Sequence, residues 1–372
     1  MGEPLKTFFS PELVRRMAAD IERVAPAFPA RAFARRASRG LDGLELLERA
    51  RQIADALGEH LPAAYPEAIE VLLRSLGPEH ATDELIGAGM APFYYLPHTL
   101  LVAERGLEHF DLSLDAQYAL TKRFSAEGSI RTFIAADPER TFARLHVWAT
   151  DDDAHVRRLP SEGTRLRLPW ARRVPWLDAN PRRVLELLER LKDDPAPLVR
   201  RSVANNLNDL SKVHPELAVE TCRAWLGARS AGTEALVRHA LRSLVKKGHR
   251  GALQVLGVGA HPFVAVQGGR LSTRSVRLGG ELGFSFELVG TKARPQRLAV
   301  DYAVHFVKAN GTTRAKVFKL KQVTLHGATP MRFEGKVSFV PMTTRRHYPG
   351  RHRIEILVNG FAFPLGEFEL RR

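Results

Sequence analysis

The chain has 372 residues, 44% hydrophobic and 26% charged, a balance typical of soluble globular protein and a length sufficient for two or three domains. Lysine and arginine outnumber aspartate and glutamate by 56 to 41, and the net charge of +15 favours an anionic partner. The single cysteine, Cys222, excludes an internal disulfide framework, and no apolar run of about 18 residues could span a bilayer. We therefore expect a monomeric cytoplasmic protein with no membrane partner.

The segment from Ser10 to about Lys247 is predicted to be almost entirely helical. Leucine and alanine recur at helical spacing, and Asp, Ser, Pro or Gly stand at the breaks. The clearest helices are predicted at residues 11–24, 44–57, 65–76, 115–124, 180–191 and 234–246. Strand patterns are nearly absent from this segment.

A repeated motif occupies the second half of the helical segment. DDDAHVRRL is matched by DDPAPLVRRSV and more loosely by GTEALVRHAL, which places Val156, Val199 and Val237 in equivalent positions, 43 and 38 residues apart. Such spacing is close to that of HEAT or armadillo-like repeats, which stack in units of about 40 to 47 residues and leave a concave binding face. We therefore predict a mainly α fold for residues 1–257, a HEAT-like helical repeat solenoid.

The first copy of the motif carries charged residues along one side of its predicted helix. If DDDAHVRRLPSEGTRLRLPW is a helix capped by an aspartate, its apolar residues Val156, Leu159 and Leu166 share one side. The other side, which we expect to be exposed, carries His155, Arg158, Glu162 and Arg165. Arg158 and Glu162 are four residues apart and can pair, so a solvated helix face with a weak salt bridge is the alternative to a functional site.

The second copy repeats this arrangement. In PLVRRSVANNLNDLSK the core positions are Val199, Val203, Leu207 and Leu210, and the polar residues opposite them are Arg201, Asn205, Asn208, Asp209 and Lys212. Two adjacent repeats thus each present one carboxylate, Glu162 or Asp209, among cations and amides. This duplication favours a functional site over a merely solvated surface.

A third acid lies upstream, in LTKRFSAEGSIRTFI. Glu127 has Arg123 and Arg131 four residues to either side, and we expect it to be partly buried and held by Arg131. Because buried charges need partners in any protein, an ion pair that fixes two helices is an equally good interpretation.

After Leu256 the pattern changes from helical spacing to alternation. Six or seven short strands are predicted, in ELGFSFELV, RLAVDYAVHFV, AKVFKLKQVTL, RFEGKVSFV, GRHRIEILV and FAFPLGEFEL. We predict an all-β immunoglobulin-like sandwich at residues 269–372, joined to the repeat by a linker at 258–268.

The predicted sandwich is the basic part of the chain. From His261 onward there are 19 basic and 7 acidic residues, a net charge of +12 out of the total of +15. A cluster within it consists of Arg345, Arg346, His347, Arg351, His352 and Arg353. We expect this cluster to contact an anionic partner; a basic but passive surface is the alternative.

Three blocks of the sequence resemble the signature blocks of the AlkC-type DNA alkylation repair glycosylases, which are related to AlkD. The blocks are TKRFSAEGSIR, WATDDDAHVRRLPSEGTRLRLPWA and DDPAPLVRRSVANNLNDLSK, and the resemblance runs through residues 7–226. An appended Ig-like domain is known in a subset of this family. The resemblance implies a HEAT-like fold that grips duplex DNA and removes alkylated bases, chiefly 3-methyladenine and 3-methylcytosine, without flipping the base and without a cofactor.

Carried over to matching positions, the resemblance implies roles for individual residues. The active-site acids would be Glu127, Glu162 and Asp209, and Trp170 would be the aromatic residue beside the damaged base. The candidate DNA-binding cations near these acids are Arg157, Arg158, Arg165, Arg201 and Lys212. For the sandwich, the one-sided basic charge and not the resemblance makes Arg345, Arg346 and Arg351 candidates for a second DNA contact.

The sequence departs from the family pattern at two places. Pro160 stands inside the helix that bears Glu162, where it removes one backbone hydrogen bond and is expected to bend the helix. Gly128 and Thr132 vary the block around Glu127. The three acids themselves are present.

Two other functions fit the residues. A non-catalytic DNA-binding repeat protein would keep the fold without the chemistry, although the acids and Trp170 are retained here. A repeat scaffold with a basic tail would bind RNA or an acidic partner with no preference for duplex DNA. Metal chemistry is not favoured, because the aspartates at 151–153 precede a helix and act first as caps, and no second cluster accompanies His155.

Overall fold

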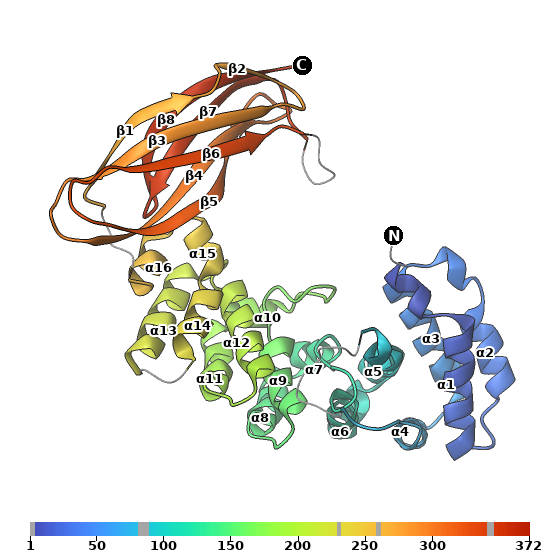
Figure 1. The fold of residues 1–372 in the computed structure, drawn as a ribbon. Helices are drawn as coiled ribbons and strands as arrows, with labels where there is room; N and C mark the ends of the chain where they lie inside the picture. The colour runs from blue at the N-terminus through green and yellow to red at the C-terminus, as the bar shows by residue number, and fades with distance from the viewer. Residues whose placement is uncertain (1–3, 81–88, 229–231, 258–261, 341–345) are drawn as a thin grey trace. The chain divides into compact units, whose positions relative to one another are not determined.

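The computed structural model describes residues 4–80, 89–228, 232–257, 262–340 and 346–372. The chain folds as two compact units, one formed by Met1–Val213 and Ser230–His239, the other by His214–Arg229 and Ala240–Arg372. As predicted, a helical repeat precedes an all-β domain: the described elements are helices up to residue 255 and strands from residue 264 (Figure 1). The first strand begins inside the segment 258–268 that was predicted to be a linker, and residues 258–261 lie outside the described residues.

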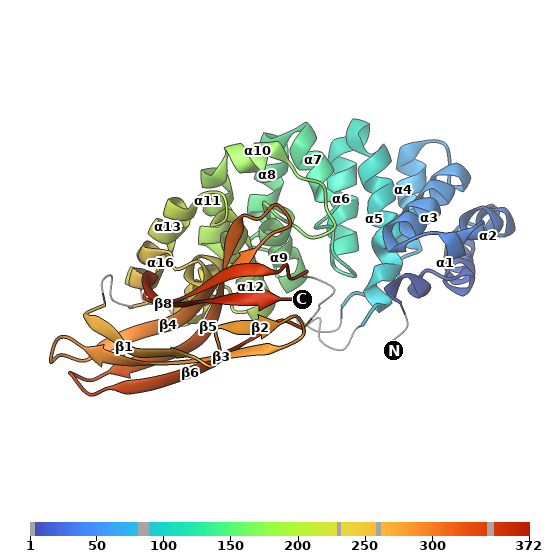
Figure 2. The ribbon, with the colours of Figure 1, turned by 90° about the horizontal axis from the view of Figure 1, so that it is seen from above.

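The first unit is built from short helices that follow one another along the chain, coloured from blue to yellow-green in Figure 2. Its described α-helices are α1 (Pro11–Val24), α2 (Ala30–Ser38), α3 (Leu46–His60), α4 (Tyr65–Arg74), α5 (Leu96–Arg105), α6 (Phe110–Thr121), α7 (Ile130–Ala136), α8 (Pro138–Trp148), α9 (Ala154–Gly163), α10 (Pro175–Ala179), α11 (Pro181–Leu191), α12 (Pro197–Leu210) and α14 (Thr233–Ala240). Short 3-10 helices are η1 (Leu5–Phe8), η2 (Leu41–Gly43), η3 (Ala91–Tyr95) and η4 (Leu107–His109).

Capping chemistry sets where these helices begin. Helix α1 covers the predicted range because the Ser10 side chain caps it and Pro11 occupies its first turn. Helix α3 starts two residues later than predicted because Glu45 and Glu48 form a capping box. None of the described helices is long and apolar enough to cross a lipid bilayer.

The predicted repeat is visible in matching contacts of α9 and α12. Val156 and Val199 are both fully buried, as is Val237 of α14. Arg157 donates from Nη1 to the carbonyls six and five residues before it, at 2.9 and 2.8 Å. Arg200, 43 residues later, donates to the carbonyls at the same two offsets. The first arginine of the motif therefore ties each helix to the turn that precedes it.

The second unit combines helices with a β-sandwich. Its helices are α13 (Pro215–Ala228), α15 (Arg242–Lys246) and α16 (Arg250–Val255), and its strands are β1 (Val264–Leu271), β2 (Ser275–Arg277), β3 (Glu281–Gly290), β4 (Gln296–Val307), β5 (Thr313–Leu325), β6 (Met331–Ser338), β7 (Gly350–Val358) and β8 (Phe361–Arg371). One sheet has the order β1-β3-β6 and the other β2-β8-β7-β4-β5. The predicted helix 234–246 is two helices, α14 and α15, which meet at Leu241.

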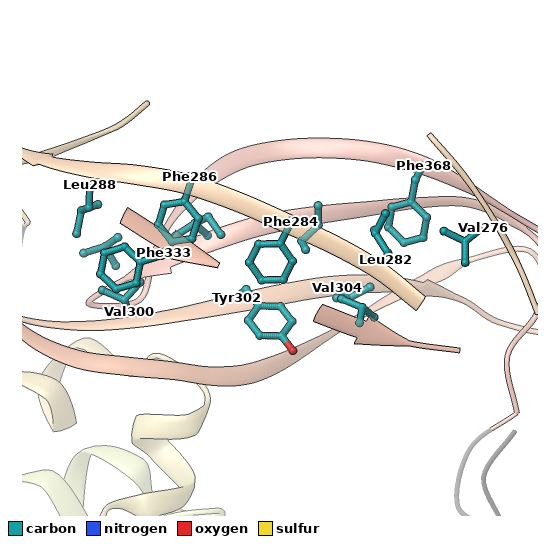
Figure 3. Close-up of a cluster of buried hydrophobic side chains, with 14 of the residues drawn as sticks. Val276, Leu282, Phe284, Phe286, Leu288, Val300, Tyr302, Val304, Phe333 and Phe368 are labelled. Carbon is teal, nitrogen blue, oxygen red and sulfur yellow. The ribbon is translucent and has the colours of Figure 1, made fainter. Parts of the chain in front are cut away.

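Aromatic rings and aliphatic side chains fill the sandwich between its two sheets (Figure 3). Phe286 stacks on Phe333 of the neighbouring strand, with ring centroids 5.1 Å apart. Phe284 contacts Tyr302 of the opposite sheet, with centroids 4.9 Å apart. The alternation read from the sequence thus places one face of each strand in this core.

Candidate active site

Three acids that lie far apart in the sequence meet in one charged cluster of the first unit. Glu127 lies in the turn before α7, Glu162 near the end of α9 and Asp209 near the end of α12. The Arg158 guanidinium lies 2.9 Å from Glu127 Oε2 and 3.6 Å from Glu162 Oε2. The Arg165 guanidinium lies 2.6 Å from Glu162 Oε1 and 2.8 Å from Asp209 Oδ2. Acids and arginines alternate, and we call these five residues the acid–arginine row.

Further hydrogen bonds and one lysine complete the surroundings of the two inner acids. Ser202 donates to Glu162 Oε2 at 2.6 Å and accepts from the Ser161 hydroxyl at 2.7 Å. The Lys212 ammonium lies 2.7 Å from Asp209 Oδ1, so both Asp209 oxygens are paired. With Lys212 included, three carboxylates are balanced by three cations.

The acids are less exposed than their helical spacing predicts. Side-chain exposure is 31% for Glu127, 6% for Glu162 and 2% for Asp209. Helices α9 and α12 pack with their polar sides together, and helical spacing cannot distinguish such an interface from a solvated surface. The prediction that Glu162 and Asp209 lie on an exposed face is therefore wrong, and so is the alternative of a weak surface salt bridge.

Helix α9 is shorter than predicted. It ends at Gly163, so Arg165 and Leu166 follow the helix instead of continuing it. The helix runs through Pro160, whose carbonyl accepts a 2.7 Å hydrogen bond from the Thr164 hydroxyl. Pro160 thus leaves Glu162 within the row.

Burial and pairing have opposite effects on the charges of the row. Burial alone raises the pKa of Glu162, but the charges of Arg158 and Arg165 and a hydrogen bond from Ser202 outweigh it, so this pKa lies below that of an ordinary glutamate. Burial lowers the pKa of both arginines, and the neighbouring carboxylates more than offset this, so both lie above the ordinary arginine value. Glu162 is therefore ionised at neutral pH.

Glu127 pairs with Arg158 instead of Arg131, the partner that four-residue spacing predicts. Residues 122–129 form turns and not a helix, so the spacing does not bring the two side chains together. Arg131 is 1% exposed and donates to three backbone carbonyls, and Arg123 donates to two others. Glu127 also accepts a 2.8 Å hydrogen bond from Ser125.

Trp170 lies in the loop that joins α9 to α10. Leu166 and Val174 anchor the loop in the core, whereas Trp170 is 65% exposed. Its φ of 61° places it in the left-handed region, which residues with a side chain rarely adopt. Arg172 and Arg173 in the same loop are exposed; they were not predicted as site residues, although they stand beside the aromatic residue in the sequence.

The other cations of the repeat that were predicted to bind DNA differ in their exposure to solvent and in their ion pairs. Arg201 of α12 is exposed, and Lys212 is 40% exposed beside Asp209. Arg157 instead lies 2.6 Å from Asp194, its side chain is 14% exposed, and it bonds two backbone carbonyls. Arg157 therefore stabilises the repeat and is not one of the proposed DNA contacts.

Only part of the basic cluster predicted on the sandwich is exposed and able to bind an anionic partner. Arg346 is exposed, with its guanidinium 5.8 Å from the centre of the Tyr348 ring. Arg351 is exposed but pairs with Glu367. Arg345 lies outside the described residues.

Two histidines of that cluster are buried and do not lie on the basic surface where they were predicted. His347 and His352 are buried against aromatic rings, and burial lowers the pKa of His352, which is therefore neutral at neutral pH. A better basic surface lies on the edge strand β5, whose exposed cations are Arg314, Lys316, Lys319 and Lys321. This surface was not predicted, although RAKVFKLK carries four cations within eight residues.

Comparisons with known proteins match both parts of the chain. The family model described as DNA alkylation repair enzyme matches residues 124–244, and the model described as the C-terminal Ig-like domain of uncharacterised protein YhaZ matches residues 265–372. The uncharacterized protein YhaZ of Bacillus subtilis (strain 168) is 35% identical over 317 residues, which are 85% of this chain and 85% of the relative.

A solved structure is similar over the whole length of both chains. It is the Pseudomonas fluorescens alkylpurine DNA glycosylase AlkC bound to DNA containing an abasic site analog, with 36% sequence identity and a TM-score of 0.85. The repeat match at residues 124–244 includes all three acids of the row, and the sandwich match follows it along the chain. The chain therefore belongs to the DNA alkylation repair enzyme family, as an AlkC-type member with a C-terminal Ig-like domain.

Proposed function

We propose that this protein is a DNA glycosylase that hydrolyses the N-glycosidic bond of cationic alkylated bases, 3-methyladenine and 3-methylcytosine, in duplex DNA. The observation that carries the proposal is the acid–arginine row, in which carboxylates from three separate elements are joined by ion pairs. Support also comes from the similar AlkC structure, whose DNA contains an analog of the abasic site that base removal leaves.

The chemistry of such a substrate explains the use of carboxylates. A base alkylated at N3 is positively charged, so it takes the electron pair of the breaking C1′–N bond and leaves as a neutral molecule without a strong general acid. The positive charge passes to the sugar, which becomes oxocarbenium-like. Fixed carboxylates stabilise this cation, and a water molecule then adds to C1′ and gives up a proton.

We assign the acids different roles according to their exposure. Glu127, the most exposed at 31%, is the acid that accepts the proton of the attacking water. Glu162 and Asp209, at 6% and 2%, act through their fixed negative charge. Arg158 and Arg165 keep Glu162 ionised, and Arg165 holds Glu162 and Asp209 in place.

The proposed DNA contacts use the exposed cations of the first unit and Trp170. Arg172, Arg173 and Arg201 bind phosphates, because they are exposed to solvent. Lys212, 40% exposed, binds phosphate at the edge of the row. Trp170 presents an aromatic face that attracts a cationic base by up to about 2 kcal/mol once water is excluded. Such a contact suits a base that stays in the duplex.

A second DNA contact is proposed on the sandwich. Arg346 and the cations of β5 are exposed and suited to sequence-independent phosphate binding. Arg351 contributes less, because Glu367 partly neutralises it. Base-specific reading by these residues is not part of the proposal.

Release of methylated bases from alkylated duplex DNA tests the proposal. Wild-type protein is expected to release 3-methyladenine and 3-methylcytosine. Glu162→Gln, Asp209→Asn and Glu127→Gln are each expected to lower the single-turnover rate by about 10²- to 10³-fold, the range for losing one group that stabilises a transition-state charge. Affinity for duplex DNA, measured by fluorescence anisotropy, should be retained.

A matched control separates chemistry from stability. Asp194→Asn breaks the buried ion pair between Asp194 and Arg157, which lies outside the row. The side chain of Asp194 is 4% exposed and that of Arg157 is 14% exposed. This substitution is expected to lower the thermal unfolding temperature without lowering the release rate. Unchanged release by all three acid variants would remove the row from the mechanism.

The burial of Asp209 favours one alternative function, a DNA-binding repeat protein in which the row is only a structural ion network. In that case wild-type protein would bind duplex DNA and release no base. A scaffold for an acidic partner would instead bind heparin or RNA as tightly as duplex DNA at the same salt concentration.

A further inference from the structure

Arg131 is a buried cation that the proposed chemistry does not use. It stands in the first turn of α7 and is 1% exposed. Its Nη1 donates to the carbonyls of Gly163 and Arg165 at 2.7 and 2.8 Å, and its Nε donates to the carbonyl of Arg172 at 2.9 Å. A buried arginine usually has a carboxylate as its hydrogen-bond partner, and here backbone carbonyl oxygens take that place.

These three carbonyls lie on both sides of Trp170 along the chain. Gly163 is the last residue of α9, Arg165 opens the loop, and Arg172 stands two residues beyond Trp170. Carbonyls at the end of a helix lack partners within the helix, and a cation there also interacts favourably with the helix dipole. Arg131 therefore caps α9 and holds the returning part of the loop at the same time.

The backbone around this point has little freedom. A Cβ on Gly163 would lie 2.6 Å from Cγ2 of Ile130, the neighbour of Arg131, so the start of α7 and the end of α9 are in close contact. Trp170, at the exposed part of the loop, has a φ of 61°. An unfavourable backbone conformation persists only where its surroundings hold it, and Arg131 bonds the loop on either side of it.

We propose that Arg131 is a positioning residue for base excision, which fixes Trp170 through one end of the loop and Arg165 through the other. The inference rests on the proposed function. Arg131 acts through the backbone that carries these two side chains, one proposed to contact the base and the other bridging Glu162 and Asp209. A lysine keeps the charge but cannot reproduce the planar set of donors, so it should release the loop.

Arg131→Lys and Arg49→Lys form a matched pair. Arg49 is also a buried arginine, 5% exposed, that donates to two backbone carbonyls, at 3.0 and 3.1 Å. Arg131→Lys is expected to lower the single-turnover excision rate at saturating DNA by about 10- to 100-fold, the effect of a small misplacement of reacting groups, with little change in DNA affinity. Arg49→Lys should leave the rate unchanged. Arg131→Gln, which donates without burying a charge, is the second variant if Arg131→Lys does not fold.

Fluorine NMR of protein labelled with 5-fluorotryptophan reports on the loop without any activity. The chain has four tryptophans, and Trp170→Phe identifies the Trp170 resonance. In Arg131→Lys this resonance should shift and broaden while those of the buried Trp148 and Trp225 stay in place. A merely structural role would move all of them together.

The outcomes separate the two proposals. An Arg131 variant with a wild-type excision rate or an unchanged Trp170 resonance would overturn the positioning role. If wild-type protein releases no base, the proposed function fails and the role in excision fails with it. A moved Trp170 resonance would then show that the contact between Arg131 and the loop itself is real, so the failure would lie in the function.

Discussion

The arginines of the acid–arginine row in the helical repeat and the cations of strand β5 in the sandwich are arranged in opposite ways. In the acid–arginine row, Arg158 and Arg165 are 15% and 13% exposed, and each contacts two carboxylates. The cations of β5 lie exposed on an edge strand, and among the described residues they have no ion-pair partner within 4.0 Å. Burial and pairing go together in the first region, and exposure goes with the absence of pairing in the second.

This difference separates two uses of positive charge. A buried pair fixes where a charge lies, depends on the geometry of its neighbours, and is little affected by salt. An exposed cation attracts any polyanion and is screened by salt. We therefore expect substitutions in the row to change stability and chemistry, and substitutions on β5 to change DNA affinity.

The largest effect is expected from Arg165→Gln, which removes one cation from both Glu162 and Asp209. Breaking a buried pair in this way should lower the free energy of unfolding by about 3 to 5 kcal/mol. The β5 control Lys321→Gln should change it by less than about 0.5 kcal/mol. Urea denaturation followed by far-UV circular dichroism measures both, and equal stability of the two variants would contradict the contrast between the regions.

Acid titration should reveal the pairing of Glu162. Its pKa in the folded protein lies below the ordinary value of 4.5, so the ionised carboxylate stabilises the fold above that value and the stabilisation is lost as the pH falls through the lowered pKa. The stability difference between wild type and Glu162→Gln should therefore be full at neutral pH and shrink in acid. Urea denaturation over a pH series measures it, and a pH-independent difference would argue against the charged pairing.

A smaller loss is expected from Ser202→Ala, which removes the 2.6 Å hydrogen bond to Glu162 Oε2. Hydrogen bonds to charged groups contribute about 1.5 to 3 kcal/mol, so the unfolding free energy should fall by this amount. Ser161→Ala removes a hydroxyl that donates to neutral partners, and should cost only about 1 kcal/mol. Thermal and urea unfolding of the two variants measure both losses. A loss for Ser161→Ala as large as that for Ser202→Ala would contradict the support that Ser202 gives the carboxylate.

The smallest effect on the fold is expected from replacing the four β5 cations with glutamine. Excision at saturating DNA should be unchanged, because the row is untouched. The slope of log affinity against log salt should become shallower by about 0.9 for each phosphate that the variant no longer binds. Anisotropy titrations at several salt concentrations measure the slope, and an unaltered slope would show that β5 does not touch phosphates.

Patterns in the sequence predicted the structure correctly where residues close together in the chain determine it. Ser10 and Pro11 set the start of α1, and the alternation in β3 places Phe284 and Phe286 in the sandwich core, as predicted. The 43-residue repeat placed the Glu162 and Asp209 helices next to each other, and the resemblance named both acids. Their convergence could therefore be anticipated from the chain alone.

What helical spacing could not predict is which element covers a polar face. Glu162 and Asp209 were expected to be exposed and are buried, because α9 and α12 pack their polar sides against each other. The pairing of Glu127 with Arg131 assumed a helix where the chain turns. Arg157 and Arg158 are adjacent and identical in type, yet one braces the backbone and the other joins the row, a distinction that only their contacts reveal.

The row and Lys212 together are electrically neutral, with three carboxylates and three cations in direct contact. The electric fields of opposite charges this close cancel within a short distance. The site therefore exerts almost no electrostatic attraction on a polyanion that is farther away than the Debye length of about 8 to 10 Å. Steering of the substrate must then come from surface charge elsewhere on the molecule. The rate of DNA association can accordingly change with ionic strength while the rate of bond cleavage stays the same, because bond cleavage depends on the arrangement of the ion pairs within the row.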